Sequence, residues 1–297
     1  MILVTGATGL VGHHLLEELA DLGAPATGLV RVEARGLGLP GGAGYLVGNL
    51  DDPGPPDVLR GFDRVFLLSP MHEGQAELEI AFVDSLISAG HRPHVVKLAA
   101  DGFQDPDCEV RFMHSHRLVA RHLDAIHIPV TYIAPNLYME NLLALADEMR
   151  DRGLLAVPGG WAQVGFVATS DVAAVAARAL VADPEEHLDQ VHVVTGPEAL
   201  SYADVAARVS AVFAREVGYH DQSLAEARTA MRVRGLAPWV LDGMLELHEW
   251  ARHGGCATVT GTVRQLTGRE PRPFQDWLEE LRGAFVGRPQ ELSPPRF

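Results

Sequence analysis

The sequence predicts an α/β fold, a doubly wound parallel sheet followed by a smaller, mostly helical C-terminal part. Two observations carry this prediction. Short apolar runs alternate with helical patterns throughout the first half of the 297-residue chain, which is the order of a parallel sheet with helices on both faces. A glycine-rich segment also separates the first apolar run from the first helical pattern.

Six strands are expected in the first half, and each is a short apolar run: residues 2–4, 27–30, 45–48, 65–68, 95–98 and 130–133. Helices are expected at residues 13–22, 78–89, 114–125 and 137–149. Parallel strands end at the same edge of a sheet, and ligands bind there. The rim expected to bind a ligand therefore contains Gly6, Asn49, Ser69, Ala99 and Asn136.

The glycine-rich segment, from Thr5 to Gly12, reads TGATGLVG directly after the first strand. Gly6 permits a tight turn, Gly9 lets a pyrophosphate approach the backbone, and Gly12 lets the helix pack against the strand. Free N–H groups and the positive end of the helix dipole then face the phosphates. The segment predicts a Rossmann-type dinucleotide site whose cradle consists of Gly6, Ala7, Thr8, Gly9, Leu10 and Val11.

The end of the second strand indicates which dinucleotide binds. Arg31 stands there, with Arg35 close behind. A site that prefers NAD usually has a carboxylate at this point for the ribose 2′-hydroxyl, whereas an arginine suits a 2′-phosphate. The predicted cofactor is therefore NADP(H), the alternative being that Arg31 is an ordinary solvated charge.

Two domains are expected: an NAD(P)-binding Rossmann domain at residues 1–155 and a substrate-binding or lid region at residues 156–297. Strands near 164–168 and 191–195 are expected to return to the sheet from the second region. Helices are expected at residues 171–180 and 201–213, with two more between residues 222 and 252, where Met and Trp side chains favour core packing. The tail after Gly287 is expected to be extended and loosely held.

Composition excludes several classes of partner. The net charge of −15 argues against nucleic acid and anionic membranes. No apolar stretch is long enough to span a membrane and no signal peptide is recognised, so a cytoplasmic protein is expected. Neither the two cysteines nor the histidine pairs have the spacing of metal ligands, and no metal is expected. A monomer or homodimer is expected.

Several segments taken together resemble the NmrA-like branch of the atypical short-chain dehydrogenase/reductase superfamily, and the resemblance runs almost end to end. They are residues 5–12, 48–51, 65–70, 96–98, 135–141, 170–173, 195–197 and 266–269. The resemblance implies an adenine contact for Asn49 and Leu50, and a lid over the nicotinamide end for the segment at 222–252. Further cofactor contacts are expected at Leu68, Ser69, Pro70, Leu98, Ala99, His116, Pro135, Asn136 and Tyr138.

The chain departs from the wider superfamily at the usual proton donor, the tyrosine of a Tyr-x-x-x-Lys helix. Lys97 is the single lysine, and Pro93 stands four residues before it, so the motif is absent. Phe112 takes the position of the tyrosine and His116 that of the lysine, while Ala99 or Ala100 stands where a serine is usual. The candidate catalytic residues that remain are His116 and Ser69.

Two functions fit these residues. The first is an NADPH-dependent reductase that transfers hydride to a carbonyl or quinone-like group of an aromatic or polycyclic small molecule. Its proton comes from His116, His114, a bound water or the substrate, with solvent or substrate favoured because the phenol is missing. The preference for arginine over lysine suggests a GC-rich genome, which is compatible with an antibiotic-producing bacterium. Ketoreduction in aromatic polyketide antibiotic tailoring is therefore one such reaction. The alternative is an NADP(H)-sensing regulatory protein without catalysis.

Overall fold

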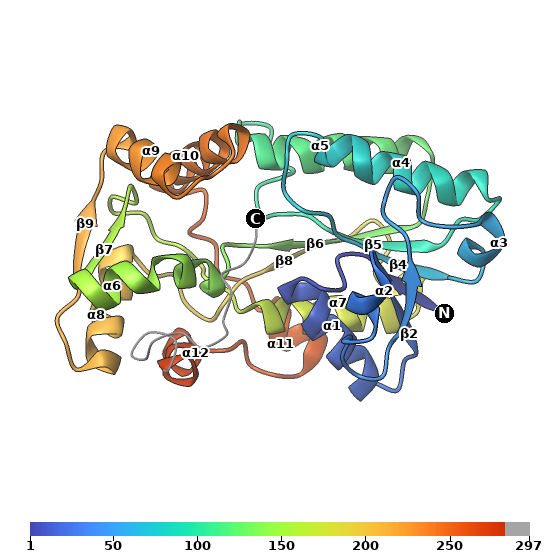
Figure 1. Cartoon of the computed structure of the whole chain (residues 1–297), viewed down its shortest axis with the longest axis horizontal. Helices are drawn as coiled ribbons and strands as arrows, with labels where there is room; N and C mark the ends of the chain where they lie inside the picture. Colours follow the sequence, from blue (N-terminus) through green and yellow to red (C-terminus); the bar gives the residue numbers. More distant parts are fainter. Residues whose placement is uncertain (283–297) are drawn as a thin grey trace.

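The computed structural model describes residues 1–282 (Figure 1). Seven parallel strands form one sheet in the order β3-β2-β1-β4-β5-β6-β8. They are β1 (Ile2–Val4), β2 (Ala26–Val30), β3 (Gly44–Val47), β4 (Arg64–Leu67), β5 (His94–Leu98), β6 (Val130–Pro135) and β8 (Val191–Val194). The predicted fold class is confirmed. The tail predicted after Gly287 lies outside the described residues.

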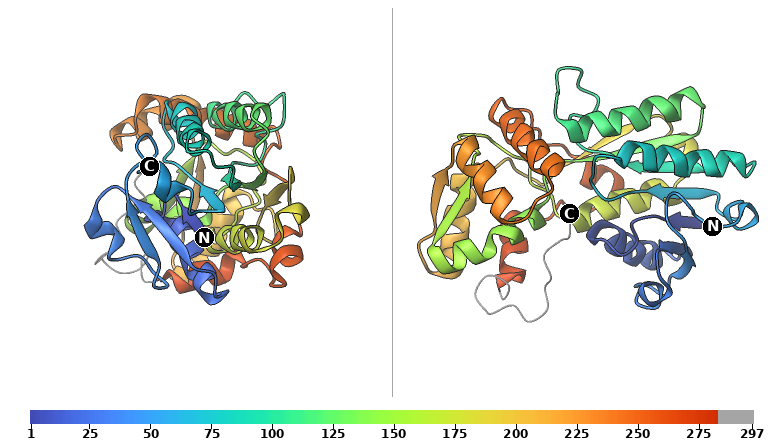
Figure 2. Two further views of the ribbon diagram at one scale, coloured as in Figure 1. Left: turned by 90° about the vertical axis from the view of Figure 1, so that its right-hand side faces the viewer. Right: turned by 45° about the horizontal axis from the view of Figure 1, so that its top comes forward.

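Helices cover both faces of the sheet (Figures 1 and 2). One face carries α3 (Pro56–Leu59), α4 (Gln75–Ser88) and α5 (Arg111–Ala125), and the other carries α1 (Leu10–Asp21), α7 (Thr169–Val181) and α11 (Thr262–Thr267), while α2 (Glu33–Gly36) follows β2. Val95 belongs to the apolar cluster under α4 and α5, and its neighbour Val96 belongs to the cluster under α1 and α7. Because both faces of the central strands are buried, those strands read as mainly apolar runs, β1 (ILV) most clearly.

A smaller lobe lies beyond the carboxyl edge of the sheet (Figure 1, left). It contains a two-stranded parallel sheet of β7 (Leu154–Val157) and β9 (Gly218–Asp221), together with α6 (Ala146–Arg152) and α8 (Tyr202–Phe213). Neither strand was predicted, because the two segments that pair are about sixty residues apart in the sequence. The expected domain boundary at residue 155 falls inside β7.

Two expected elements differ in the structure. The strand expected at 164–168 is absent, since Val164 and Val167 make only isolated bridges, to Leu200 and Tyr138. The segment is apolar because it is buried between the sheet and the smaller lobe, where the N–H of Gly165 donates to Cys256 O. The helix expected at 137–149 begins as a 3-10 helix, η1 (Met139–Leu145), and becomes α-helical only in α6.

The remaining helices are η2 (Pro184–Glu186), α9 (Leu224–Val233), α10 (Pro238–Arg252) and α12 (Phe274–Glu280). Helices α9 and α10 pack against each other through Ala227, Leu241 and Leu245, and α10 lies beside the start of α5. In residues 1–282 we find no helix long and apolar enough to cross a membrane.

Candidate active site

The glycine-rich segment forms a tight turn between β1 and α1. Gly6 has a φ of +63°, and the N–H of Gly9 donates to Gly6 O at 2.9 Å. A Cβ on Gly12 would lie 2.2 Å from Gly6 O, which only glycine at position 12 avoids. Glycine at positions 6 and 12 therefore permits this tight turn.

The start of α1 suits an anion. Its N-cap, Gly9, offers no side chain to the first backbone N–H groups, and the first turn contains no acidic residue. Thr8, Gly9 and Leu10 are exposed, and the first N–H groups of α1 have no acceptor within the helix. Backbone donors and the helix dipole fit the pyrophosphate of a dinucleotide at this place.

The loop is fixed to the end of the neighbouring strand β4. Thr5 Oγ1 accepts from the N–H of Leu68 at 2.7 Å, and a Cβ on Gly6 would lie 2.8 Å from Leu68 Cγ. Leu68 is half-buried, Ser69 is buried and Pro70 is exposed. The tertiary structure thus brings the predicted cradle against residues 68–70, for which further cofactor contacts are predicted.

The predicted adenine and 2′-phosphate contacts lie on the adjacent ends of β2 and β3. Arg31 is exposed and makes no ion pair with any of residues 1–282, so its charge is available to a ligand. Asn49 is also exposed, and its Oδ1 accepts from the N–H of Asp52, whereas Leu50 is buried. This placement is compatible with the predicted contacts.

At the end of β6, the side chain of Asn136 is engaged by the protein itself. Its Nδ2 donates to Asp101 Oδ2 at 3.2 Å and to Cys256 O at 3.0 Å, and its Oδ1 accepts from the N–H of Leu137. Asn136 therefore fixes the backbone that follows β6. Pro135 is buried and Tyr138 half-buried, and burial raises the pKa of the Tyr138 phenol.

The two candidate catalytic residues meet in one buried polar network. Ser69 Oγ donates to Glu79 Oε1 at 2.6 Å, and Lys97 Nζ lies 2.9 Å from Glu79 Oε2. The same Nζ lies 3.3 Å from Nδ1 of His116 and also donates to Leu98 O. Ser69, which follows β4, and residues of α4, β5 and α5 therefore converge near the end of β5, where Leu98 and Ala99 are buried.

The charges in this network are strongly coupled. Burial lowers the pKa of Lys97, and Glu79 opposes that change by stabilising the ammonium. Burial also lowers the pKa of His116 well below its usual value, and the positive charge of Lys97 adds to this effect. His116 is therefore neutral near pH 7.

Glu79 and Lys97 were not predicted as site residues, because Lys97 was considered only for the missing motif. A signal was nevertheless present. A lysine inside the apolar strand run 95–98 is rarely buried without a partner, and Glu79 lies on the buried face of a helix whose other buried residues are mostly apolar. Only the fold shows that the two residues are partners.

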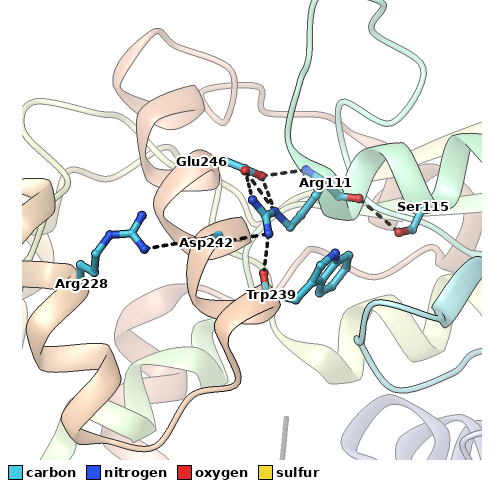
Figure 3. Close-up of polar contacts among 6 residues, drawn as sticks. All are labelled: Arg111, Ser115, Arg228, Trp239, Asp242 and Glu246. Atoms are coloured by element: carbon cyan, nitrogen blue, oxygen red, sulfur yellow. Dashed lines mark hydrogen bonds and ion pairs between the residues drawn. The ribbon is translucent and has the colours of Figure 1, made fainter.

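Phe112, at the position of the usual tyrosine, has a packing role. Its ring lies 5.4 Å from that of Trp239, and a Cβ on Gly243 would lie 2.4 Å from it. Next to it, Arg111 binds Glu246 and Asp242 of α10 (Figure 3). The start of α5 thus attaches α10 instead of presenting a proton donor.

Comparison with known proteins identifies the family. The family model of the NmrA-like family matches residues 1–232. The chain belongs to the NmrA-like family, as the sequence analysis predicted. It is 32% identical to an NAD(P)H azoreductase from Xenophilus azovorans, over 96% of this chain and 99% of the relative.

Two further similarities extend over nearly the whole chain. A (4-alkanoyl-5-oxo-2,5-dihydrofuran-3-yl)methyl phosphate reductase from Streptomyces griseus is 34% identical, with coverage of 96% of this chain and 99% of the relative. The solved structure of an NADPH-dependent quinone oxidoreductase from Escherichia coli, in complex with NADPH, has a TM-score of 0.84 at 22% identity. The similarity covers 95% of this chain and 99% of the chain in that structure. This last similarity supports the fold.

Proposed function

We propose that this NmrA-like chain is an NADPH-dependent reductase that transfers hydride to a carbonyl or quinone-like group of an aromatic or polycyclic small molecule. The broader assignment, an NAD(P)H-dependent oxidoreductase with NADP(H) as cofactor, agrees with the names of the full-length relatives. The finer choice of acceptor is the proposal.

One observation carries the choice of cofactor: the start of α1, which has no side-chain cap, lies at the same edge of the sheet as Arg31, which forms no ion pair within residues 1–282. The first fits a pyrophosphate and the second a 2′-phosphate. When bound there, NADPH supplies the hydride. The chain's own residues hold the acceptor in line and provide the proton for its heteroatom.

The acceptor class is supported by the relatives. Their names include an azoreductase and a quinone oxidoreductase, which act on conjugated groups. Such acceptors spread developing charge over a ring system, so an enzyme without the usual tyrosine can reduce them. A ketone of an aromatic polyketide is one candidate, and the Streptomyces relative makes antibiotic tailoring worth testing.

The test is to mix the purified protein with NADPH and a panel of quinones, azo dyes and polycyclic ketones, and to follow the absorbance of the reduced nicotinamide. Oxidation of NADPH with at least one acceptor supports the proposal. The regulatory alternative predicts no oxidation with any acceptor, together with different affinities for NADP⁺ and NADPH. That result would replace the reductase with a sensor.

A further inference from the structure

Lys97 is the only lysine in the chain, and the structure buries it completely. Burial of an unpaired ammonium is very costly, so a lysine at such a position has partners. Three acceptors surround Nζ: the carboxylate of Glu79, the carbonyl of Leu98 and Nδ1 of His116. An ammonium group has three N–H donors, and each of them finds one acceptor here.

This arrangement fixes the tautomer of His116. Since Lys97 donates to Nδ1, a neutral His116 ring has its proton on Nε2. Nε2 has no hydrogen-bond partner among residues 1–282 and is not one of their buried unpartnered atoms, so it reaches the outside of the protein. His116 therefore presents an accessible N–H donor, with the Lys97 ammonium at the other nitrogen of the ring.

We propose that Lys97, held by Glu79, is a proton reservoir for His116 during reduction of the acceptor; the inference rests on the proposed function. The Nε2–H bond breaks as a bond from that proton to the acceptor's heteroatom forms. At the same time, a Lys97 Nζ–H bond breaks and an Nδ1–H bond forms. His116 remains neutral throughout, and Lys97 becomes a neutral amine.

The resting state returns by the reverse path. Solvent protonates the exposed Nε2, and the proton on Nδ1 passes back to Lys97. The side chain of Glu79 favours the ammonium form of Lys97. Ser69, which donates to the same carboxylate at 2.6 Å, holds Glu79 in place. The contact with Lys97 thus distinguishes His116 from His114, which is exposed and has no such partner among residues 1–282.

A chain with one lysine allows a direct measurement. Protein labelled with ¹³C and ¹⁵N only in lysine gives a single side-chain signal, whose pH titration reports the charge of Lys97. We expect an ammonium at pH 7, with a pKa below the ordinary value of about 10.4, and a changed signal in His116→Gln. A neutral amine at pH 7, or the same signal in native protein and His116→Gln, would overturn the proposal.

The second experiment separates catalysis from folding. Lys97→Met leaves the carboxylate of Glu79 buried without a cation, and we expect it to be destabilised. The double variant Lys97→Met/Glu79→Gln removes both charges and should recover most of that stability. We expect its kcat to stay about 10²–10⁴-fold below native, the range for a lost general acid, with the Kd for NADPH changed less than about threefold.

The pH profile provides an independent readout. Because the reservoir works only while Lys97 carries its proton, kcat of the native protein should fall as the pH rises through the pKa of Lys97. The groups that face this ammonium are Glu79 from α4 and His116 from α5. The fall of kcat at alkaline pH should disappear in the double variant, because its remaining activity takes the proton from solvent.

His94→Leu is the matched control. His94 is buried at the other end of β5 and contacts Thr131 instead of the network. It should keep the native kcat and pH profile. If the native protein is an active reductase and the double variant has the same kcat, the proton reservoir is overturned but the proposed function is not. A native protein that oxidises NADPH with no acceptor would overturn the proposed function, and the reservoir with it.

Discussion

Glu246 accepts hydrogen bonds from both the backbone N–H and the guanidinium of Arg111, at 3.0 and 2.5 Å (Figure 3). One carboxylate thereby caps the start of α5 and anchors α10 to it. His116 lies on α5 little more than one turn further along. The position of the candidate proton donor therefore depends on a contact from a segment more than a hundred residues away.

The first prediction concerns this contact. Glu246→Gln keeps the shape of the side chain and removes its charge, so we expect a loss of about 1–2 kcal/mol in the free energy of unfolding, between the values for exposed and buried pairs. Urea unfolding measures it. The matched control is Glu270→Gln, because the Arg264–Glu270 pair is about 70% exposed and should contribute less than about 0.5 kcal/mol. Equal losses in both variants would contradict the role of Glu246.

The second prediction concerns the choice of cofactor. Arg31→Asp should weaken binding of NADPH by about 1.5–3 kcal/mol and leave binding of NADH unchanged or improved, because a charge-assisted contact with the 2′-phosphate is lost. Titration of both cofactors measures the effect. Arg121→Asp makes the same charge change on an exposed residue of α5 and should not alter the preference. A native protein that binds NADPH and NADH equally would refute this role of Arg31.

A third prediction tests the glycine turn. Gly12→Ala places a Cβ 2.2 Å from Gly6 O, so the turn must open. We expect a loss of about 1–3 kcal/mol in unfolding free energy, as for other overpacked sites, and a large loss of NADPH affinity. Gly38→Ala is the control, since its Cβ would meet no atom within 4 Å. NADPH binding as tight in Gly12→Ala as in Gly38→Ala would contradict the cradle.

The fourth prediction concerns acid stability. Burial lowers the pKa of His248 to about 4, with Arg252 contributing, whereas an unfolded histidine titrates near 6.5. Between these values the unfolded chain binds the extra proton, so the native state should lose about 1.4 kcal/mol per pH unit from this residue as the pH falls. His248→Phe should reduce the dependence of unfolding free energy on pH by this amount between pH 6.5 and 4. An unchanged slope would show that His248 does not contribute.

The sequence by itself determined the parallel sheet, the glycine turn and the cofactor-binding edge. These features are local: strands buried on both faces read as apolar runs, and a turn such as Gly6 to Gly12 needs glycine wherever it occurs. The missing Tyr-x-x-x-Lys helix could also be read directly, because its spacing is fixed within one helix.

Only the tertiary structure decided which residues surround His116. Ser69, Glu79, Lys97 and His116 follow no common spacing, and they meet because β4, α4, β5 and α5 pack together. The strand pair β7 and β9 and the contact of Arg111 with Glu246 have the same origin. The free energy of each such contact comes from burial and charge pairing between distant segments, and no local pattern in the chain records which segments will meet.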